Sequence, residues 1–97
     1  MNTGISTNFI IEVKEMGMDL TEIVNLTTGT VLVLFTRPKQ MMPLMTFTVM
    51  SGGLFRFTEN ICLPPSIVRS VPKRMENEEE ALNTLRTIIT LLKEWEL

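Results

Sequence analysis

One stretch decides the fold of this 97-residue chain: Thr30-Val31-Leu32-Val33-Leu34-Phe35-Thr36. Its residues are mostly β-branched or apolar, and in a strand Val31, Val33 and Phe35 share one face while Leu32 and Leu34 share the other. Because both faces are apolar, this strand is predicted to lie at the centre of a sheet that is covered on two sides. A single layer of helix covers one side only, so another part of the chain or a partner protein has to cover the second.

The segments before this strand can be read as strands or as helices. Phe9 to Glu15 alternates like an outer strand, although its apolar residues also fit helical spacing. Leu20 to Thr27 is rich in β-branched residues, and Thr28-Gly29 after it predicts a turn that closes a hairpin with the central strand, so we favour a strand there. Asp19 and Glu22 also resemble a helix capping box. The two segments are therefore two strands, a helix and a strand, or two short helices.

The segments after the central strand continue an antiparallel meander. Leu44 to Met50 alternates, and Ser51-Gly52-Gly53 predicts a tight hairpin turn because glycine reaches the positive φ that such turns need. Leu54 to Leu63 is predicted as the next strand. Pro64-Pro65 stops the sheet, because proline has no amide hydrogen to give to a strand ladder. Residues 64–76 are predicted to be a linker.

A long amphipathic helix is predicted to close the chain, from about Glu78 to Trp95. Asn77 suits its N-cap position, with Glu80 three residues on. The apolar stripe recurs at spacings of three and four and consists of Ala81, Leu85, Ile88, Leu92 and Trp95. We therefore predict a single α+β domain over residues 1–97, an antiparallel meander of four or five strands with the C-terminal helix packed on one face. Residues 1–7 are expected to fray.

The composition is that of an unusually apolar globular chain. Hydrophobic residues make up 44% of it and charged residues 21%, with a mean hydropathy of +0.21, so a disordered chain is excluded. No run reaches the roughly 20 apolar residues that cross a bilayer, and the first residues lack the features of a secretory signal. A cytoplasmic or nuclear protein without membrane contact is expected. A domain of this size has much surface for its volume, so burial against a partner would help it.

The sequence offers no constellation for catalysis. It has no histidine and a single cysteine, which excludes histidine-assisted hydrolases, imidazole zinc sites and Cys-x-x-Cys motifs. Cys62 lies between Ile61 and Leu63 and is predicted to be a buried small hydrophobic residue. Gly52-Gly53 lacks the following Lys-Ser or Lys-Thr of a phosphate-binding loop. We therefore expect a protein that is not an enzyme and that binds no cofactor or metal.

A loop between two prolines is a candidate partner site. It carries Arg37, Lys39, Met41 and Met42. Methionine suits adaptable apolar contacts, so an exposed pair on a protruding loop would bind a partner; alternatively, the pair folds back to fill a gap in the core. The apolar faces without cover extend the partner-binding set by Leu32, Leu34, Leu91 and Trp95. We predict a protein-binding adaptor or assembly chaperone that acts as a homo- or heterodimer.

The basic middle of the chain supports nucleic-acid binding as the alternative. The net charge is −2, but the acidic residues gather near both ends, and the alternative site consists of Arg56, Arg69, Lys73 and Arg74. Arg56 lies between Phe55 and Phe57, and RNA-binding sheets use exposed aromatic rings beside cations. These two rings, however, are predicted to belong to the core. Opposite charges on adjoining elements of one domain also simply complement each other.

The central strand and the closing helix carry a resemblance to a known family. The first segment runs from Val31 to Arg37 and on to Leu44 after a hairpin strand, and the second runs from Ala81 to Ile89 and ends at Trp95. Together they resemble the small proteasome-assembly chaperones of the third type. The resemblance implies a compact sheet-and-helix protein that pairs with a related subunit and holds proteasome α-ring subunits during assembly. The family has an additional helix and strand where this chain has only Pro64 to Met75.

Overall fold

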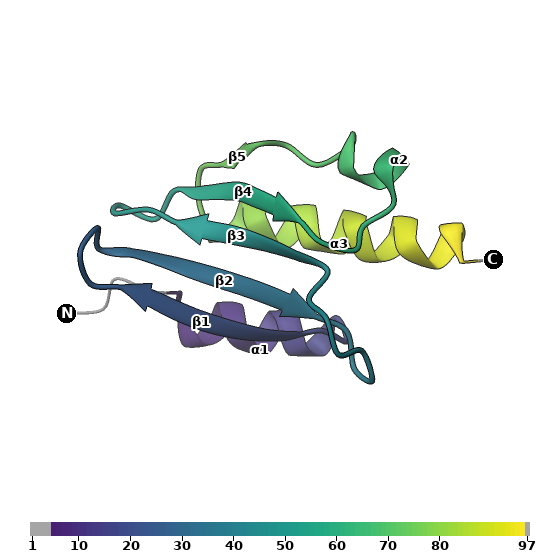
Figure 1. The fold of residues 1–97 in the computed structure, drawn as a ribbon, viewed down its shortest axis with the longest axis horizontal. Helices are drawn as coiled ribbons and strands as arrows, with labels where there is room; N and C mark the ends of the chain where they lie inside the picture. Colours follow the sequence, from purple (N-terminus) through teal and green to yellow (C-terminus); the bar gives the residue numbers. More distant parts are fainter. Residues whose placement is uncertain (1–4, 97) are drawn as a thin grey trace.

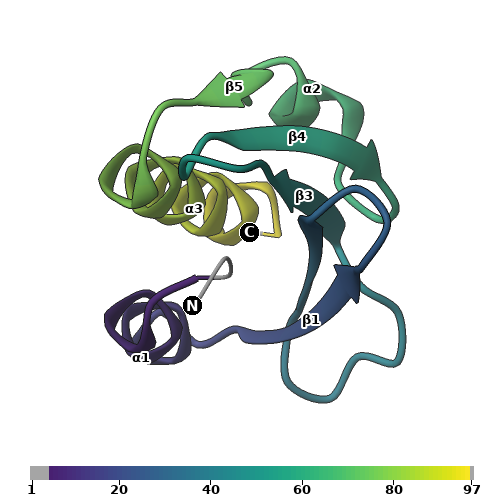
Figure 2. The same ribbon diagram turned by 90° about the vertical axis from the view of Figure 1, so that its left-hand side faces the viewer.

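A five-stranded antiparallel sheet forms one layer of the molecule, and the helices α1 and α3 lie together on one face of it (Figures 1 and 2). The computed structural model describes residues 5–96. The elements in chain order are α1 (Thr7–Glu15), β1 (Asp19–Asn25), β2 (Thr30–Thr36), β3 (Met45–Val49), β4 (Phe55–Asn60), α2 (Pro65–Val68), β5 (Arg74–Met75) and α3 (Glu78–Trp95). The strands neighbour one another in chain order. The predicted α+β meander with a C-terminal helix on one face is confirmed.

The core fills the space between the sheet and the two helices. Phe47 of β3 is fully buried, and its ring centroid lies 4.8 Å from that of Phe35 and 6.5 Å from that of Phe55, edge to face in both cases. Val33 of β2 is paired with Phe47 and is also fully buried. The predicted alternation is therefore confirmed for the inner face of the sheet, where aromatic packing adds to the burial of apolar area.

Neither α1 nor α3 covers the outer face of the sheet (Figure 2), although Thr46 of β3 is buried there. β2 lies second in the sheet and β3 is the middle strand, so the prediction that Thr30 to Thr36 is the central strand is wrong. Leu32 and Leu34 face outward and are only half-buried, because both helices lie on the opposite side (Figure 2). The helices of residues 5–96 thus cover one side of this strand, not two.

The segment from Phe9 to Glu15 belongs to a helix, so its prediction as an outer strand is wrong and the helical alternative is right. The Ser6 Oγ caps α1 by accepting the backbone N–H of Phe9 at 3.1 Å. Phe9 and Val13, one helical turn apart, are fully buried, whereas Ile11 is 49% exposed. A strand would place these three apolar side chains on one face. The segment therefore follows helical spacing, because residues four apart, Phe9 and Val13, are the two side chains that reach the core.

The lead-in to α1 is fixed from Ile5 onward. Ile5 is 4% exposed, and Ser6 donates two hydrogen bonds to the Glu78 carboxylate, from its backbone N–H at 2.8 Å and from its hydroxyl at 2.6 Å. The prediction that residues 1–7 fray is therefore wrong for the last three of them. Its other part, residues 1–4, lies outside the described residues.

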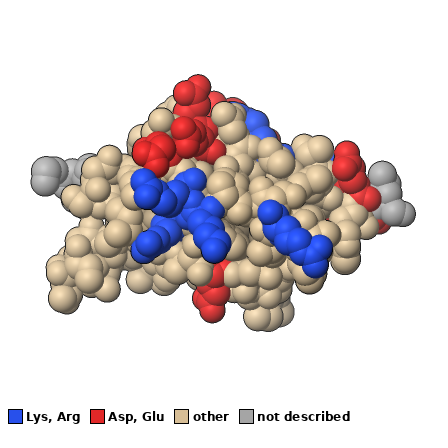
Figure 3. Space-filling view, turned by 90° about the horizontal axis from the view of Figure 1, so that it is seen from above, with Lys and Arg blue, Asp and Glu red and all other residues tan. Residues whose placement is uncertain are grey.

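The predicted linker over residues 64–76 contains a short helix and an edge strand. Ile67 of α2 and Met75 of β5 are buried, so the segment contributes to the core as well as crossing to α3. β5 pairs with β4 through Phe55 and Met75 and through Arg56 and Arg74. Figure 3 shows basic side chains gathered on this upper surface, with acidic side chains beside them.

The closing helix begins where the sequence predicts. The Asn77 Oδ1 accepts the backbone N–H of Glu80 at 2.9 Å, and the Glu80 carboxylate accepts the backbone N–H of Glu76, also at 2.9 Å. The buried residues of α3 are Ala81, Leu82, Leu85, Ile88 and Leu92. Trp95, the last member of the predicted stripe, is 62% exposed instead, because it lies at the end of the helix.

Asn77→Ala is expected to lower the free energy of unfolding by about 1 kcal/mol, because it removes the acceptor for an amide hydrogen at the helix start. Urea denaturation followed by far-ultraviolet circular dichroism measures the change. Asn83→Ala is the matched control, since Asn83 is exposed within the same helix. Equal stabilities of the two variants would contradict the capping role.

Candidate partner-binding groove

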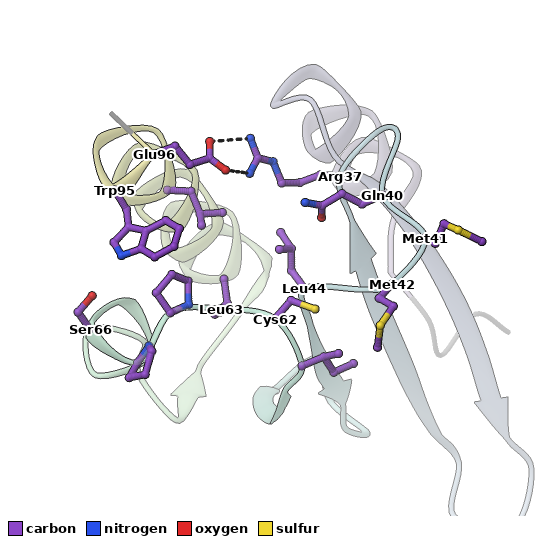
Figure 4. Close-up of a pocket in the computed structure, with 14 residues that line it drawn as sticks. Arg37, Gln40, Met41, Met42, Leu44, Cys62, Leu63, Ser66, Trp95 and Glu96 are labelled. Atoms are coloured by element: carbon purple, nitrogen blue, oxygen red, sulfur yellow. Dashed lines mark hydrogen bonds and ion pairs between the residues drawn. The ribbon is translucent and has the colours of Figure 1, made fainter.

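A groove opens where three segments of the chain meet: the β2–β3 connector, the β4–α2 connector and the end of α3 (Figure 4). Its volume is about 880 Å³. The lining residues are mostly apolar and comprise Arg37, Gln40, Met41, Met42, Leu44, Ile61, Cys62, Leu63, Pro64, Pro65, Ser66, Leu92, Trp95 and Glu96. This size lies within the range of pockets that bind small ligands or a few side chains of a partner.

The floor of the groove is held by the backbone of Leu44. Its N–H donates to the carbonyl of Phe35 at 2.7 Å, and its carbonyl accepts the N–H groups of Ile61 and Cys62 at 3.0 and 2.9 Å. The Leu44 side chain is 2% exposed. These bonds tie the two connectors together, and β4 ends at Asn60, three residues earlier than the predicted strand. The groove is thus built on fixed backbone, although its walls are loops.

An ion pair joins the α3 end of the groove to the end of β2. The Arg37 guanidinium donates to both carboxylate oxygens of Glu96, at 2.5 and 3.1 Å. This hydrogen bond lowers the pKa of Glu96 and raises that of Arg37. Both side chains keep some solvent exposure, so the pair mainly orients the helix end rather than stabilising the whole fold.

The pKa of Glu96 is expected to lie below its ordinary value of 4.5 and to return toward that value in the Arg37→Gln variant. Because the pKa of Glu96 is lower in the folded state, the ion pair stabilises the folded protein at pH values above the ordinary pKa. This stabilisation is lost as the pH falls through the folded-state pKa. Carbon-13 NMR titration of the glutamate carboxyl groups measures both values. Identical Glu96 midpoints in the two proteins would contradict the pairing.

Large apolar side chains stand exposed on both sides of the groove. Met41 and Met42 lie on the β2–β3 connector and are 99% and 59% exposed, and Trp95 lies on α3 and is 62% exposed (Figure 4). Of the two alternatives for the methionine pair, exposure is therefore right and burial in the core is wrong. Exposed large apolar side chains that rim an apolar groove are typical of an interaction site.

The structure brings together only part of the predicted partner-binding set. Arg37, Met41, Met42 and Trp95 line the groove, and Lys39 lies exposed on the same connector with a positive φ of 71°. Leu32 and Leu34 lie on the outer face of the sheet instead. Leu91 is half-buried and lines a separate, smaller hollow with Val71 and Pro72.

Sequence reasoning missed several residues of the groove. Cys62 is exposed, so its prediction as a buried residue is wrong. That prediction depended on its apolar neighbours Ile61 and Leu63, but β4 ends at Asn60 and leaves Cys62 in the connector that lines the groove. Glu96 was not predicted as a site residue. It lies four residues after Leu92, about one helical turn along the same face of α3, and this spacing was the signal that could have indicated it. Pro64 and Pro65 were read only as a stop signal, and they also form part of the wall.

The residues of the nucleic-acid alternative lie at the opposite edge of the sheet from β1. Arg56 and Arg74 are paired across β4 and β5, Lys73 precedes Arg74, and Arg69 ends α2. Arg74 also forms a 3.2 Å ion pair with Glu76. Phe55 is buried, and Phe57 is half-buried and packs against the core, as predicted. The Phe55 ring therefore offers no face for stacking, and the Phe57 ring is only partly accessible.

No group of acidic, cysteine or histidine side chains suited to a metal ion occurs among residues 5–96. No helix in this part of the chain has the length and apolar character needed to cross a membrane. Comparisons with protein-family models, with curated proteins and with solved structures found no match. The interpretation of the groove therefore depends on its own geometry.

Proposed function

We propose that this protein is a non-catalytic adaptor or assembly chaperone that holds an apolar segment of a partner protein in the groove between the two connectors and α3. One observation supports the proposal most: Met41, Met42 and Trp95 leave large apolar surface in solvent around a groove with an apolar lining. Burial of a large apolar side chain contributes about 1.5–3 kcal/mol. A partner that covers these three side chains therefore gains several kcal/mol, which offsets much of the entropy cost of association.

The chemistry of the lining favours apolar side chains in the partner. Methionine is flexible and polarisable, so Met41 and Met42 can adapt to different shapes, and tryptophan is enriched where binding energy is concentrated. Arg37 and Glu96 neutralise each other at one end, so the groove presents little net charge to a ligand. An extended or helical segment with two or three large apolar residues fits these features.

The resemblance to proteasome-assembly chaperones makes proteasome α-ring subunits the first purified partners to test. This resemblance depends on the apolar pattern of β2 and α3. A groove built from the ends of these two elements would suit a chaperone that shields an apolar surface of an unassembled subunit.

Trp95→Ala is expected to abolish capture of a partner at the groove, since truncation of a central tryptophan typically costs 2 kcal/mol or more. The wild type, Trp95→Ala and Ile11→Ser are each immobilised, and the proteins that they retain are compared. Every retained protein is then purified and tested alone for binding to all three. Ile11 is an exposed apolar residue outside the groove, so its variant is the matched control. The proposal is supported if purified partners bind the wild type and the control but not Trp95→Ala. It fails if every purified partner binds all three equally.

The basic surface over β4 and β5 favours a second candidate, a nucleic-acid binder that contacts phosphates through Arg56, Lys73 and Arg74. Binding of this kind weakens steeply as salt rises. A gel shift at low and high salt with wild type and Arg56→Gln tests it. A salt-sensitive shift that is weaker in the variant supports this candidate, and no shift at low salt excludes it.

A further inference from the structure

The edge strand β1 is unusually open for an exposed sheet edge. It is seven residues long, pairs only with β2 and has six exposed residues out of seven. Proline is absent from it, and Ile23 and Val24 are 51% and 55% exposed, followed by Leu26 at 92%. Edge strands of soluble proteins are usually short, bulged, covered or interrupted by proline, because their free backbone groups otherwise pair with another strand. β1 shows none of these four features, and the charges that also protect sheet edges are limited here to Asp19 and Glu22.

We propose that β1 is the contact surface for a second copy of this chain, which pairs with it antiparallel around a two-fold axis to form one continuous ten-stranded sheet. This inference is independent of the groove, which lies at the ends of β2, β4 and α3. The occupant of a bare edge has to supply an extended strand with a free edge of its own. Among residues 5–96 the other sheet edge is β5, which has two residues, so β1 of a second copy is the matching strand. Such a pairing is closed and does not propagate.

The charge pattern of β1 selects the register of this pairing. Side chains directly opposite each other in a two-fold antiparallel pair share a face, so the axis passes through one residue that meets its own copy. An axis at Glu22 would bring two carboxylates together, which is destabilising. An axis at Ile23 places Ile23 opposite its copy and Glu22 opposite Val24 of the partner. An axis at Thr21 or at Val24 would instead place Ile23 opposite Asp19 or Asn25 of the partner and so lose the apolar pair. We therefore assign the axis to Ile23.

This register also covers exposed apolar surface. Ile23 pairs with Leu32 inside one subunit, so the outer face gains a row of four apolar side chains, Leu32 and Ile23 from each copy. Leu26 lies in the turn directly after β1 and comes near Leu20 of the partner, because both lie three residues from the axis. Leu26 is otherwise almost fully exposed. The second copy thus shields side chains that the isolated chain leaves in water.

Cysteine cross-linking tests the register. In a Cys62→Ser background, Ile23→Cys is expected to form an intermolecular disulfide on mild oxidation, because Cα atoms of directly opposite residues lie about 4.5–5.5 Å apart, within disulfide range. Glu22→Cys, the matched control, should not cross-link, since its copies are offset by two residues, about 7 Å along the strand. Cross-linking of the Ile23 variant alone supports the proposal. Cross-linking of neither, or of the Glu22 variant in preference, overturns it.

Light scattering tests the dimer itself with unmodified protein. At micromolar concentration the wild type is expected to have twice the chain mass of 11.1 kDa, and Ile23→Lys is expected to have the chain mass, because two ammonium groups would meet on the axis. Ile11→Lys, at a similarly exposed position on α1, should stay dimeric. A wild type that is monomeric, or an Ile23→Lys variant that remains dimeric with intact circular dichroism, overturns the proposal. Because the groove variants do not touch β1, failure here leaves the groove proposal standing.

Discussion

Phe47→Ala is expected to lower the free energy of unfolding by about 3–5 kcal/mol, the range for removing a buried phenylalanine side chain. Phe47 is fully buried in the middle strand of the sheet. Its ring has three aromatic neighbours, with centroids 4.8 Å away for Phe35, 6.5 Å for Phe55 and 6.1 Å for Phe57. Domains of this size have stabilities of roughly 5–15 kcal/mol, so the variant should lie close to its unfolding threshold.

Urea denaturation of wild type and Phe47→Ala measures this loss. Phe57→Ala is the matched control, because Phe57 packs against the same cluster but is only half-buried, and its truncation should cost clearly less. A Phe47→Ala variant as stable as Phe57→Ala would mean that the aromatic cluster is not the centre of the core.

Phe9→Ala is expected to destabilise the protein by about 3–5 kcal/mol, whereas Ile11→Ala should change the stability by no more than about 0.5 kcal/mol. Phe9 is fully buried, and its ring stacks on that of Phe55 at 5.3 Å. Ile11 is 49% exposed on the other side of α1. The contrast reports directly on the helix, because a strand would bury both residues together.

Thermal and urea unfolding of the two variants, each followed by circular dichroism, distinguish these cases. Comparable losses from both substitutions would contradict the packing of α1 against the sheet. A large loss from Phe9→Ala alone confirms that the first segment joins the core as a helix.

Most of the sheet could be predicted because apolar residues alternate along β2 and β3 on its inner face, although a register shift interrupts the pairing of β3 with β4. Val31, Val33 and Phe35 recur at every second residue of β2, Met45, Phe47 and Val49 do the same in β3, and glycine-containing turns follow β1 and β3. The start of α3 was equally readable, since Asn77 and Glu80 carry the capping signal in the chain itself. Local patterns of this kind need no knowledge of what lies across the core.

The first helix and the groove could not be predicted because they depend on distant contacts. Phe9 and Val13 fit a strand as well as a helix until Phe55, far along the chain, supplies the surface that buries them. The groove depends on Arg37 meeting Glu96 and on Leu44 meeting Ile61. Each pair is distant in sequence, so neither segment alone predicts the other.

Both proposals start from the same excess of apolar surface. Seven large apolar side chains are exposed in the described part of the chain: Ile11, Ile23, Val24, Leu26, Met41, Met42 and Trp95. Three of them lie at β1 and the turn that follows it, and three lie at the groove. Because α1 and α3 lie on one face of the sheet, no further helix or strand of residues 5–96 covers either group.

The fluorescence of Trp95 tests the central claim most directly, because it is the single tryptophan of the chain and stands 62% exposed at the groove. When a purified partner is added, the emission of Trp95 is expected to shift to shorter wavelength as the indole leaves water. The saturation curve of this shift should match the binding curve measured by calorimetry. A tryptophan-free partner, or one whose tryptophans are replaced by phenylalanine, keeps the signal specific. Full binding with unchanged Trp95 emission would contradict a partner site at the groove.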